Sequence, residues 1–162
     1  MEKLHALRAA IAAANPDLAR DPDRLLIWAD KGRIATRRTA ALGYEWRYRA
    51  NILIEAFTES PDAIAVPLLL WLRDAQPDLV ESFSRGDEAA KFEAHILDTT
   101  SWDLKFELEL SEAVIIAPRD GGGWDVTHLP EPSADDILLD GAAAAPLGEI
   151  WLGGMQLLPR AE

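Results

Sequence analysis

The sequence contains no cysteine, which excludes a disulfide framework, a thiolate nucleophile and a cysteine metal site. Basic residues are few, because 16 lysines and arginines stand against 28 aspartates and glutamates, and the formal net charge is -12. Clustered basic residues are what bind phosphates, so this balance argues against tight DNA binding and against anionic membranes. No apolar run approaches the roughly 20 residues of a membrane-spanning helix. Glu2 and Arg8 interrupt any secretory signal, so we expect synthesis in a cytoplasm.

A length of 162 residues suffices for one hydrophobic core without disulfides or metal ions, and 49% hydrophobic and 27% charged residues are typical of a globular domain. The composition changes after Pro130, where prolines, acids and an alanine run replace large apolar residues. We therefore expect a domain over residues 1–132. Residues 133–162 are expected to form a linker and a C-terminal hairpin around Gly153-Gly154.

Two main helices are predicted from apolar residues at helical spacing. The first covers residues 4–14 and ends at Asn15-Pro16, because the residue before a proline avoids the helical region. The second begins at Ser60-Pro61 and ends at Gln76-Pro77, and Pro67 is expected to kink it or to mark its true start.

Alternation of apolar and polar residues predicts a long strand over residues 42–55, with the aromatic face of Tyr44 to Tyr48 buried. Residues 92–96 and 102–110 alternate in the same way and are expected to form a hairpin. Further strand-like pieces are residues 25–38, expected to be a short hairpin turning at Asp30-Lys31-Gly32, and residues 124–129. Without a regular strand-helix-strand order, the fold predicted is α+β, an antiparallel or mixed β-sheet packed against two main helices.

The sequence offers no clear motif for catalysis or for a cofactor. His5, His95 and His128 lie far apart, and none has a second ligand at metal-binding spacing. The run Gly121–Gly123 lacks the lysine and the helix of a phosphate loop, and no serine stands in a G-x-S-x-G elbow. We expect no catalytic residue, no cofactor and no metal.

The segment WDLKFELEL, residues 102–110, presents a charged face of Asp103, Lys105, Glu107 and Glu109. Glu107 and Glu109 would lie about 7 Å apart on one face, which allows an acid/base pair, although a solvated strand face is the commoner use. The aromatic residues at 44–48 could stack bases, but the acidic net charge favours packing in a core. The residues alone therefore predict a binding or assembly role.

Four stretches, in this order, resemble the phage tail completion protein R family of temperate contractile-tailed phages: residues 7–37, 44–57, 61–79 and 92–132. The combination is specific: an aromatic-arginine strand at Tyr44 to Tyr48, a P-L-L-x-W-L-R helix at Pro67 to Arg73, and a DLxxELxLxE strand at Asp103 to Glu112. The resemblance covers most of the chain.

The resemblance implies a structural role in virion assembly and a fold like that of tail terminators. The protein would act at the head-proximal end of the tail, stopping tube growth and preparing the joining of the head. Its partners would be itself, as a ring of six subunits by analogy with other terminators, the tail tube protein, and neck or head-completion proteins. It would meet these partners in the host cytoplasm, act without a membrane, and remain in the virion tail of a phage or prophage.

A ring also suggests a use for the acidic charge, because a lumen lined with acids repels phosphates and lets DNA pass without binding. The candidate residues for a lumen or a subunit interface are Asp103, Lys105, Glu107, Glu109, Arg47 and Arg49. Two alternatives remain open. One is an enzyme or small-ligand-binding α+β domain that uses sheet carboxylates, and the other is a tail chaperone that does not stay in the virion.

Overall fold

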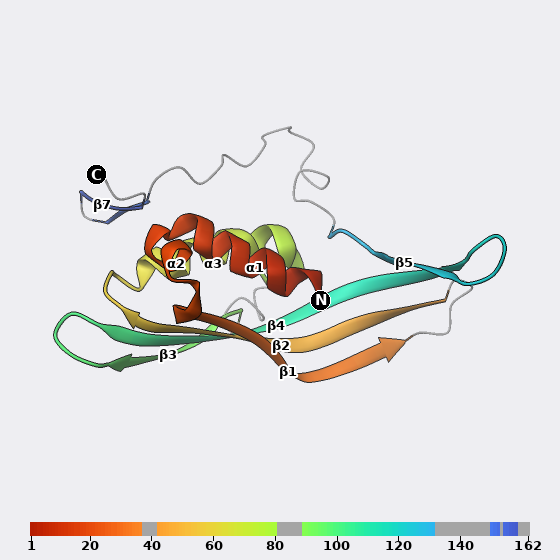
Figure 1. The fold of residues 1–162 in the computed structure, drawn as a ribbon, viewed down its shortest axis with the longest axis horizontal. Coiled ribbons are helices and arrows are strands. Elements are labelled where there is room, and N and C mark those ends of the chain that lie inside the picture. Colours follow the sequence, from red (N-terminus) through yellow and green to blue (C-terminus); the bar gives the residue numbers. More distant parts are fainter. Residues whose placement is uncertain (37–41, 81–88, 132–149, 153, 159–162) are drawn as a thin grey trace.

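A five-stranded antiparallel sheet with helices on one face forms the body of the protein, as the α+β prediction requires (Figure 1). The computed structural model describes residues 1–36, 42–80, 89–131, 150–152 and 154–158. The strands of the sheet are β1 (Leu25–Thr36), β2 (Leu42–Phe57), β3 (Lys91–Ile96), β4 (Trp102–Pro118) and β5 (Trp124–His128). Their order is β1-β2-β4-β3, and β5 pairs with the far half of β4.

The two long strands β2 and β4 follow directly from their alternating sequences. They pair over almost their whole length, and Ile52 lies opposite Phe106 while Ala50 lies opposite Leu108. Because opposed residues of an antiparallel pair share a face, the even-numbered side chains of both strands form one apolar layer. The predicted core side of residues 102–110 is confirmed, with Trp102 partly buried and the other four apolar side chains buried.

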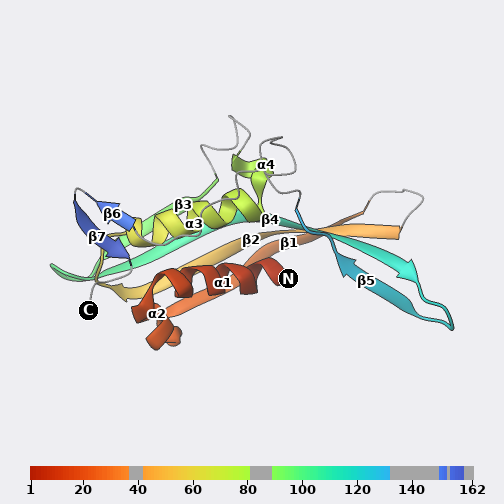
Figure 2. The same cartoon turned by 90° about the horizontal axis from the view of Figure 1, so that it is seen from above.

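Helices α1 (Glu2–Ala14) and α3 (Asp62–Ala75) lie side by side over this layer, as Figures 1 and 2 show together. They are the two main helices predicted, and their buried residues include Leu7, Ile11 and Leu68. Shorter helical segments are α2 (Pro16–Arg20), η1 (Pro22–Arg24) and α4 (Pro77–Val80).

Pro67 neither starts α3 nor ends it, but lies inside the helix and is buried. A proline has no N–H to donate to the carbonyl four residues earlier, here that of Ala63. The side chain of Asn15, buried beyond the end of α1, supplies the donor instead: its Nδ2 lies 3.3 Å from the Ala63 carbonyl and 3.0 Å from the Ile11 carbonyl. Asn15, at the end of α1, thus supplies the hydrogen bond that Pro67 cannot make within α3.

The predicted hairpin at Asp30-Lys31-Gly32 is wrong, because residues 25–36 form the single strand β1. Asp30 pairs with Arg49 and Arg33 pairs with Arg47, so two residues of β1 stand opposite one residue of β2. Lys31 adopts a φ of 49° at this point. These features define a β-bulge, which uses the same turn-forming residues as a hairpin but keeps the chain in the sheet.

The far part of the sheet extends beyond the helices as an arm, drawn at the right of Figure 1 and visible from above in Figure 2. It consists of the end of β1, the start of β2, the end of β4 and β5. Separately, β6 (Ile150–Leu152) and β7 (Met155–Leu158) pair as an antiparallel hairpin within residues 133–162. None of the helices described is long and apolar enough to span a membrane.

Candidate interaction surface

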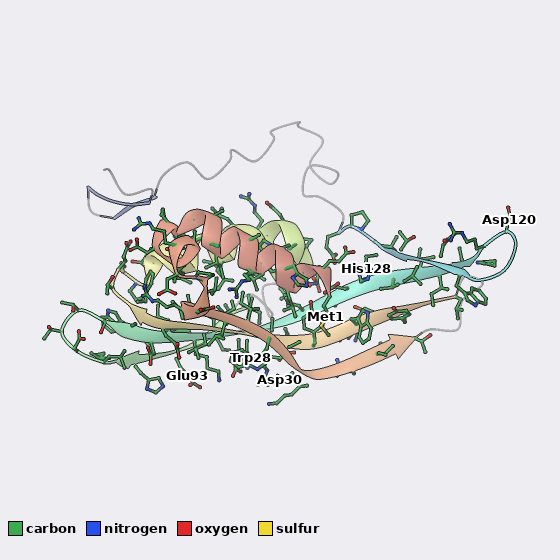
Figure 3. The ribbon with its side chains drawn as sticks, in the orientation of Figure 1. Met1, Trp28, Asp30, Glu93, Asp120 and His128 are labelled. Carbon is green, nitrogen blue, oxygen red and sulfur yellow. The ribbon has the colours of Figure 1, made fainter. Side chains whose placement is uncertain are left out.

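The six charged residues singled out in the sequence come from two neighbouring strands. Arg49 stands opposite Asp30 of β1, and Lys105 stands opposite Glu93 of β3. Figure 3 labels Asp30, Trp28 and Glu93 on the side of the sheet away from the helices, so Arg49 and Lys105 belong to that outer face. We call the residues Arg49, Lys105, Glu107 and Glu109 the charged face.

The side chains of the charged face bind one another. Arg49 Nη1 lies 2.9 Å from Glu107 Oε2, and Arg49 Nε lies 3.2 Å from Glu109 Oε1. Lys105 Nζ donates to Glu107 Oε1 at 2.7 Å. The Lys105 hydrogen bond, with Arg49 nearby, outweighs desolvation and lowers the pKa of Glu107, while the same contact raises the pKa of Lys105. The hydrogen bond to Glu109 raises the pKa of Arg49.

Arg47 and Asp103 stand apart from this network. Arg47 Nη2 and Nε both donate to Glu45 Oε2 on the same strand, at 2.7 and 2.9 Å, and this contact raises the pKa of Arg47. Asp103 Oδ1 accepts a hydrogen bond of 2.9 Å from the backbone N–H of Ala56, where a second bulge shifts the register of β2. Ala56 has a φ of 49°, so Asp103 holds a strained turn of the backbone in place.

The six residues carry three positive and three negative charges, so they do not account for the net charge of -12. Nor do Glu107 and Glu109 resemble an acid/base pair. A general acid or base near neutral pH needs a carboxyl whose pKa is raised, whereas Glu107 is held ionised by two cations.

Apolar side chains border the charged face on β1. Leu26 and Trp28 are exposed there, and Trp28 lies opposite Asn51. Asn51 is buried, and its Nδ2 has no hydrogen-bond partner among the described residues. Exposed tryptophan and apolar side chains are features of protein contact surfaces.

A second polar cluster, on the helix side, was not anticipated from the sequence. Glu112 follows the apolar series Leu104 to Leu110 in the same alternating row and is only 4% exposed. Its Oε1 accepts from the Tyr48 hydroxyl, and its Oε2 accepts from the N–H of Glu2 at 2.9 Å. His128 Nδ1 lies 3.2 Å from Oε2, outside hydrogen-bond geometry.

This cluster places a carboxylate at the first turn of α1, where the helix dipole and free N–H groups favour a negative charge. Burial raises the pKa of Glu112, but the hydrogen bonds from Tyr48 and from the first backbone N–H groups outweigh it, and the net pKa is lowered. Burial and the Glu112 contact raise the pKa of Tyr48. In the sequence, this cluster is marked by Glu112 itself, an acidic residue at a position where the strand alternation predicts an apolar one.

The three histidines are not brought together, since they lie on α1, β3 and β5. Across the part of the chain that the structure describes, no group of three or more histidine, aspartate or glutamate side chains is arranged to hold a metal ion.

Comparison with known proteins returns a family and a relative. The model of the family described as P2 phage tail completion protein R (GpR) matches residues 1–132. Tail completion protein R of Escherichia phage P2 is 35% identical over 132 residues, which cover 82% of this chain and 84% of the relative. No solved structure matches.

Proposed function

The chain belongs to the P2 phage tail completion protein R family and has a tail completion role, and from this premise we propose that it caps the head-proximal end of the tail tube and prepares that end for joining to the head. The observation that carries the proposal is the extent of the match. Residues 1–132 include both main helices and all five strands of the sheet.

The role implies contacts with other components of the phage tail. We propose a ring of subunits, six by analogy with other terminators, that touches the tail tube protein on one side and neck or head-completion proteins on the other. Assembly would take place in the host cytoplasm, and the ring would remain in the virion tail. DNA would pass through it without specific binding.

The charged face is proposed as a contact surface for a protein partner of this kind. Its ion pairs balance one another, so it attracts or repels phosphate weakly, and the neighbouring Trp28 and Leu26 supply apolar area. An acidic lumen in the ring would then be lined by acidic residues other than the three among the six candidates.

We propose that the protein acts by binding and not by catalysis. The carboxylates that an enzyme hypothesis would use are neutralised by Arg49 and Lys105 on an open sheet face. Glu107→Gln keeps the shape of the side chain and removes its charge, so an enzyme that depends on this carboxylate would lose activity. An assembly protein would keep most of its function, because the contact surface retains the Arg49–Glu109 pair and the exposed Trp28.

The test is complementation of a phage from which the gene for this chain has been deleted. We expect the deletion to leave tails of uncontrolled length that do not join heads, and both the wild-type chain and Glu107→Gln to restore infectious particles. Tails of normal length joined to heads in the absence of the chain would remove the proposed function. Mass spectrometry of the purified particles distinguishes a resident protein from a chaperone that leaves.

A further inference from the structure

Helix α3 is apolar on nearly every side. Every residue from Ala63 to Leu72 is apolar, and a run of this length fills almost three helical turns. A helix that packs on one sheet needs an apolar stripe on one side only, whereas a helix that is apolar all round is normally buried all round. We therefore expect another part of the protein to cover the side of α3 that faces away from the sheet.

Three apolar side chains lie on that side. Ile64 and Leu68 recur four residues apart and are buried in the core of the domain. Val66, Leu69 and Leu70 fall on the opposite side of the helix, because successive residues of a helix turn by about 100°. Leu69 is 52% exposed, and Val66 and Leu70 are half-buried. We call Val66, Leu69 and Leu70 the outer side of α3.

The C-terminal hairpin of β6 and β7 needs an apolar surface of this kind. Its segment IWLGGMQLL, residues 150–158, is apolar apart from its two glycines and Gln156. Two strands alone are marginally stable in water and need a further strand or layer to pack against. Figures 1 and 2 both draw the hairpin beside the start of α3, on the side away from the sheet.

The chain between the domain and the hairpin is long enough to reach α3 of the same molecule. Glu131 is tied to the first turn of α1, with its Oε1 2.6 Å from Lys3 Nζ. Residues 132–149 can span at most roughly 60 Å, whereas α3, with 14 residues, is about 21 Å long. A tether of this length holds the hairpin near its own α3 at a concentration on the order of millimolar, which favours its own chain over a second copy.

We propose that the C-terminal hairpin docks on the outer side of α3 of its own chain. The molecule then has three layers, with the sheet, the helices and the hairpin stacked in that order. The hairpin covers Val66 and Leu69 from outside the core, so the domain of residues 1–132 does not need it to fold. The family match ends at residue 132, so this contact lies beyond the matched part and does not rest on the proposed function.

Hydrogen exchange measured by mass spectrometry on the full-length chain tests the contact. In the wild type we expect the amides of β6 and β7 to exchange slowly, because docking stabilises their pairing. Leu69→Asp puts a charge on the outer side of α3 and should speed this exchange by roughly tenfold, the effect expected when one leucine is no longer buried. Val126→Asp is the matched control, since Val126 is 56% exposed on the arm, and it should leave the exchange of the hairpin unchanged.

Fast exchange of the hairpin in the wild type, or an unchanged rate in Leu69→Asp, would overturn the proposal. Faster exchange in Val126→Asp would overturn it as well, because the hairpin would then depend on the arm.

Cross-linking distinguishes the chain's own hairpin from that of a second copy. The chain has no cysteine, so Asp62→Cys in the first turn of α3 and Gln156→Cys in β7 provide one pair of thiols for a short bismaleimide. We expect a bridge within the monomer. The control pair is Asp120→Cys with Gln156→Cys, which should give no bridge because Figure 3 places Asp120 at the tip of the arm. Linked dimers, equal bridging of both pairs, or no bridge from the first pair would each overturn the proposal.

Discussion

Glu112 is the residue that departs most clearly from the pattern around it. It stands in an apolar row of β4, and its partners are 64 and 110 residues away in the chain, at Tyr48 and Glu2. The sequence could have marked it as an anomaly, but not named those partners, because they are set by how α1 and β2 pack. The alternation of Leu104 to Leu110, by contrast, was sufficient to predict which side of the strand is buried.

Glu112→Gln should reduce the free energy of unfolding at neutral pH by about 1–3 kcal/mol, because it weakens charge-assisted hydrogen bonds at a buried site. The folded-state pKa of Glu112 lies below its ordinary value of 4.5. Its contribution is therefore fully present above the unfolded-state pKa and is lost as the pH falls through the folded-state pKa. Urea unfolding at pH 7 and near pH 3 measures the difference between variant and wild type, which should shrink in acid.

Glu109→Gln is the control for that measurement, since Glu109 is mostly exposed and its pairing with Arg49 contributes little. An equal loss of stability at both pH values for Glu112→Gln would contradict the account of the cluster.

At the scale of elements, the sequence predicted the regular parts and missed two irregular ones, the bulge of β1 at Lys31 and the bulge of β2 at Ala56. The apolar residues of β2 and β4 recur with the period of a strand, and those of α1 and α3 with the period of a helix, so each pattern predicts one structure. The residues Asp30-Lys31-Gly32 do not predict one structure, because they suit a hairpin turn and a bulge equally. What decides is the length of β2, which gives β1 a partner on both sides of the bulge.

Lys31→Gly should stabilise the protein by about 0.5–1 kcal/mol, because glycine adopts the positive φ of this position without steric cost. Ala94→Gly, inside the regular strand β3, should destabilise it, since glycine weakens a strand interior. Denaturant midpoints of the two variants measure the contrast. A loss of stability with Lys31→Gly would contradict the bulge.

The hydrogen bond from Asn15 of α1's end to the Ala63 carbonyl of α3 can be tested by a double-mutant cycle. Asn15→Ala should cost about 1–3 kcal/mol in the wild type, because it leaves the Ala63 carbonyl buried without a donor. In a Pro67→Ala background the new backbone N–H can bond to that carbonyl, so Asn15→Ala should cost about 1 kcal/mol less. Additive effects of the two substitutions on unfolding would show that the amide does not replace the missing helical bond.

At the scale of the molecule, the hydrophobic core formed by the described residues runs from Leu7 to Leu110. We therefore propose that residues 1–132 fold independently, and that a chain ending at residue 132 unfolds within a few degrees of the full-length chain in calorimetry. A large fall in the unfolding temperature would mean that residues 133–162 complete the core. The α+β class could be predicted from the sequence, but the uncovered arm could not, because it depends on where the helices end above the sheet.

The central claim is that this chain is a structural part of the tail at its head-proximal end. Electron cryomicroscopy of tails purified from cells that make no heads tests it most directly. The account predicts a ring of copies of this chain on the tube end away from the baseplate. Finished tails whose head-proximal end holds tube protein alone would contradict it.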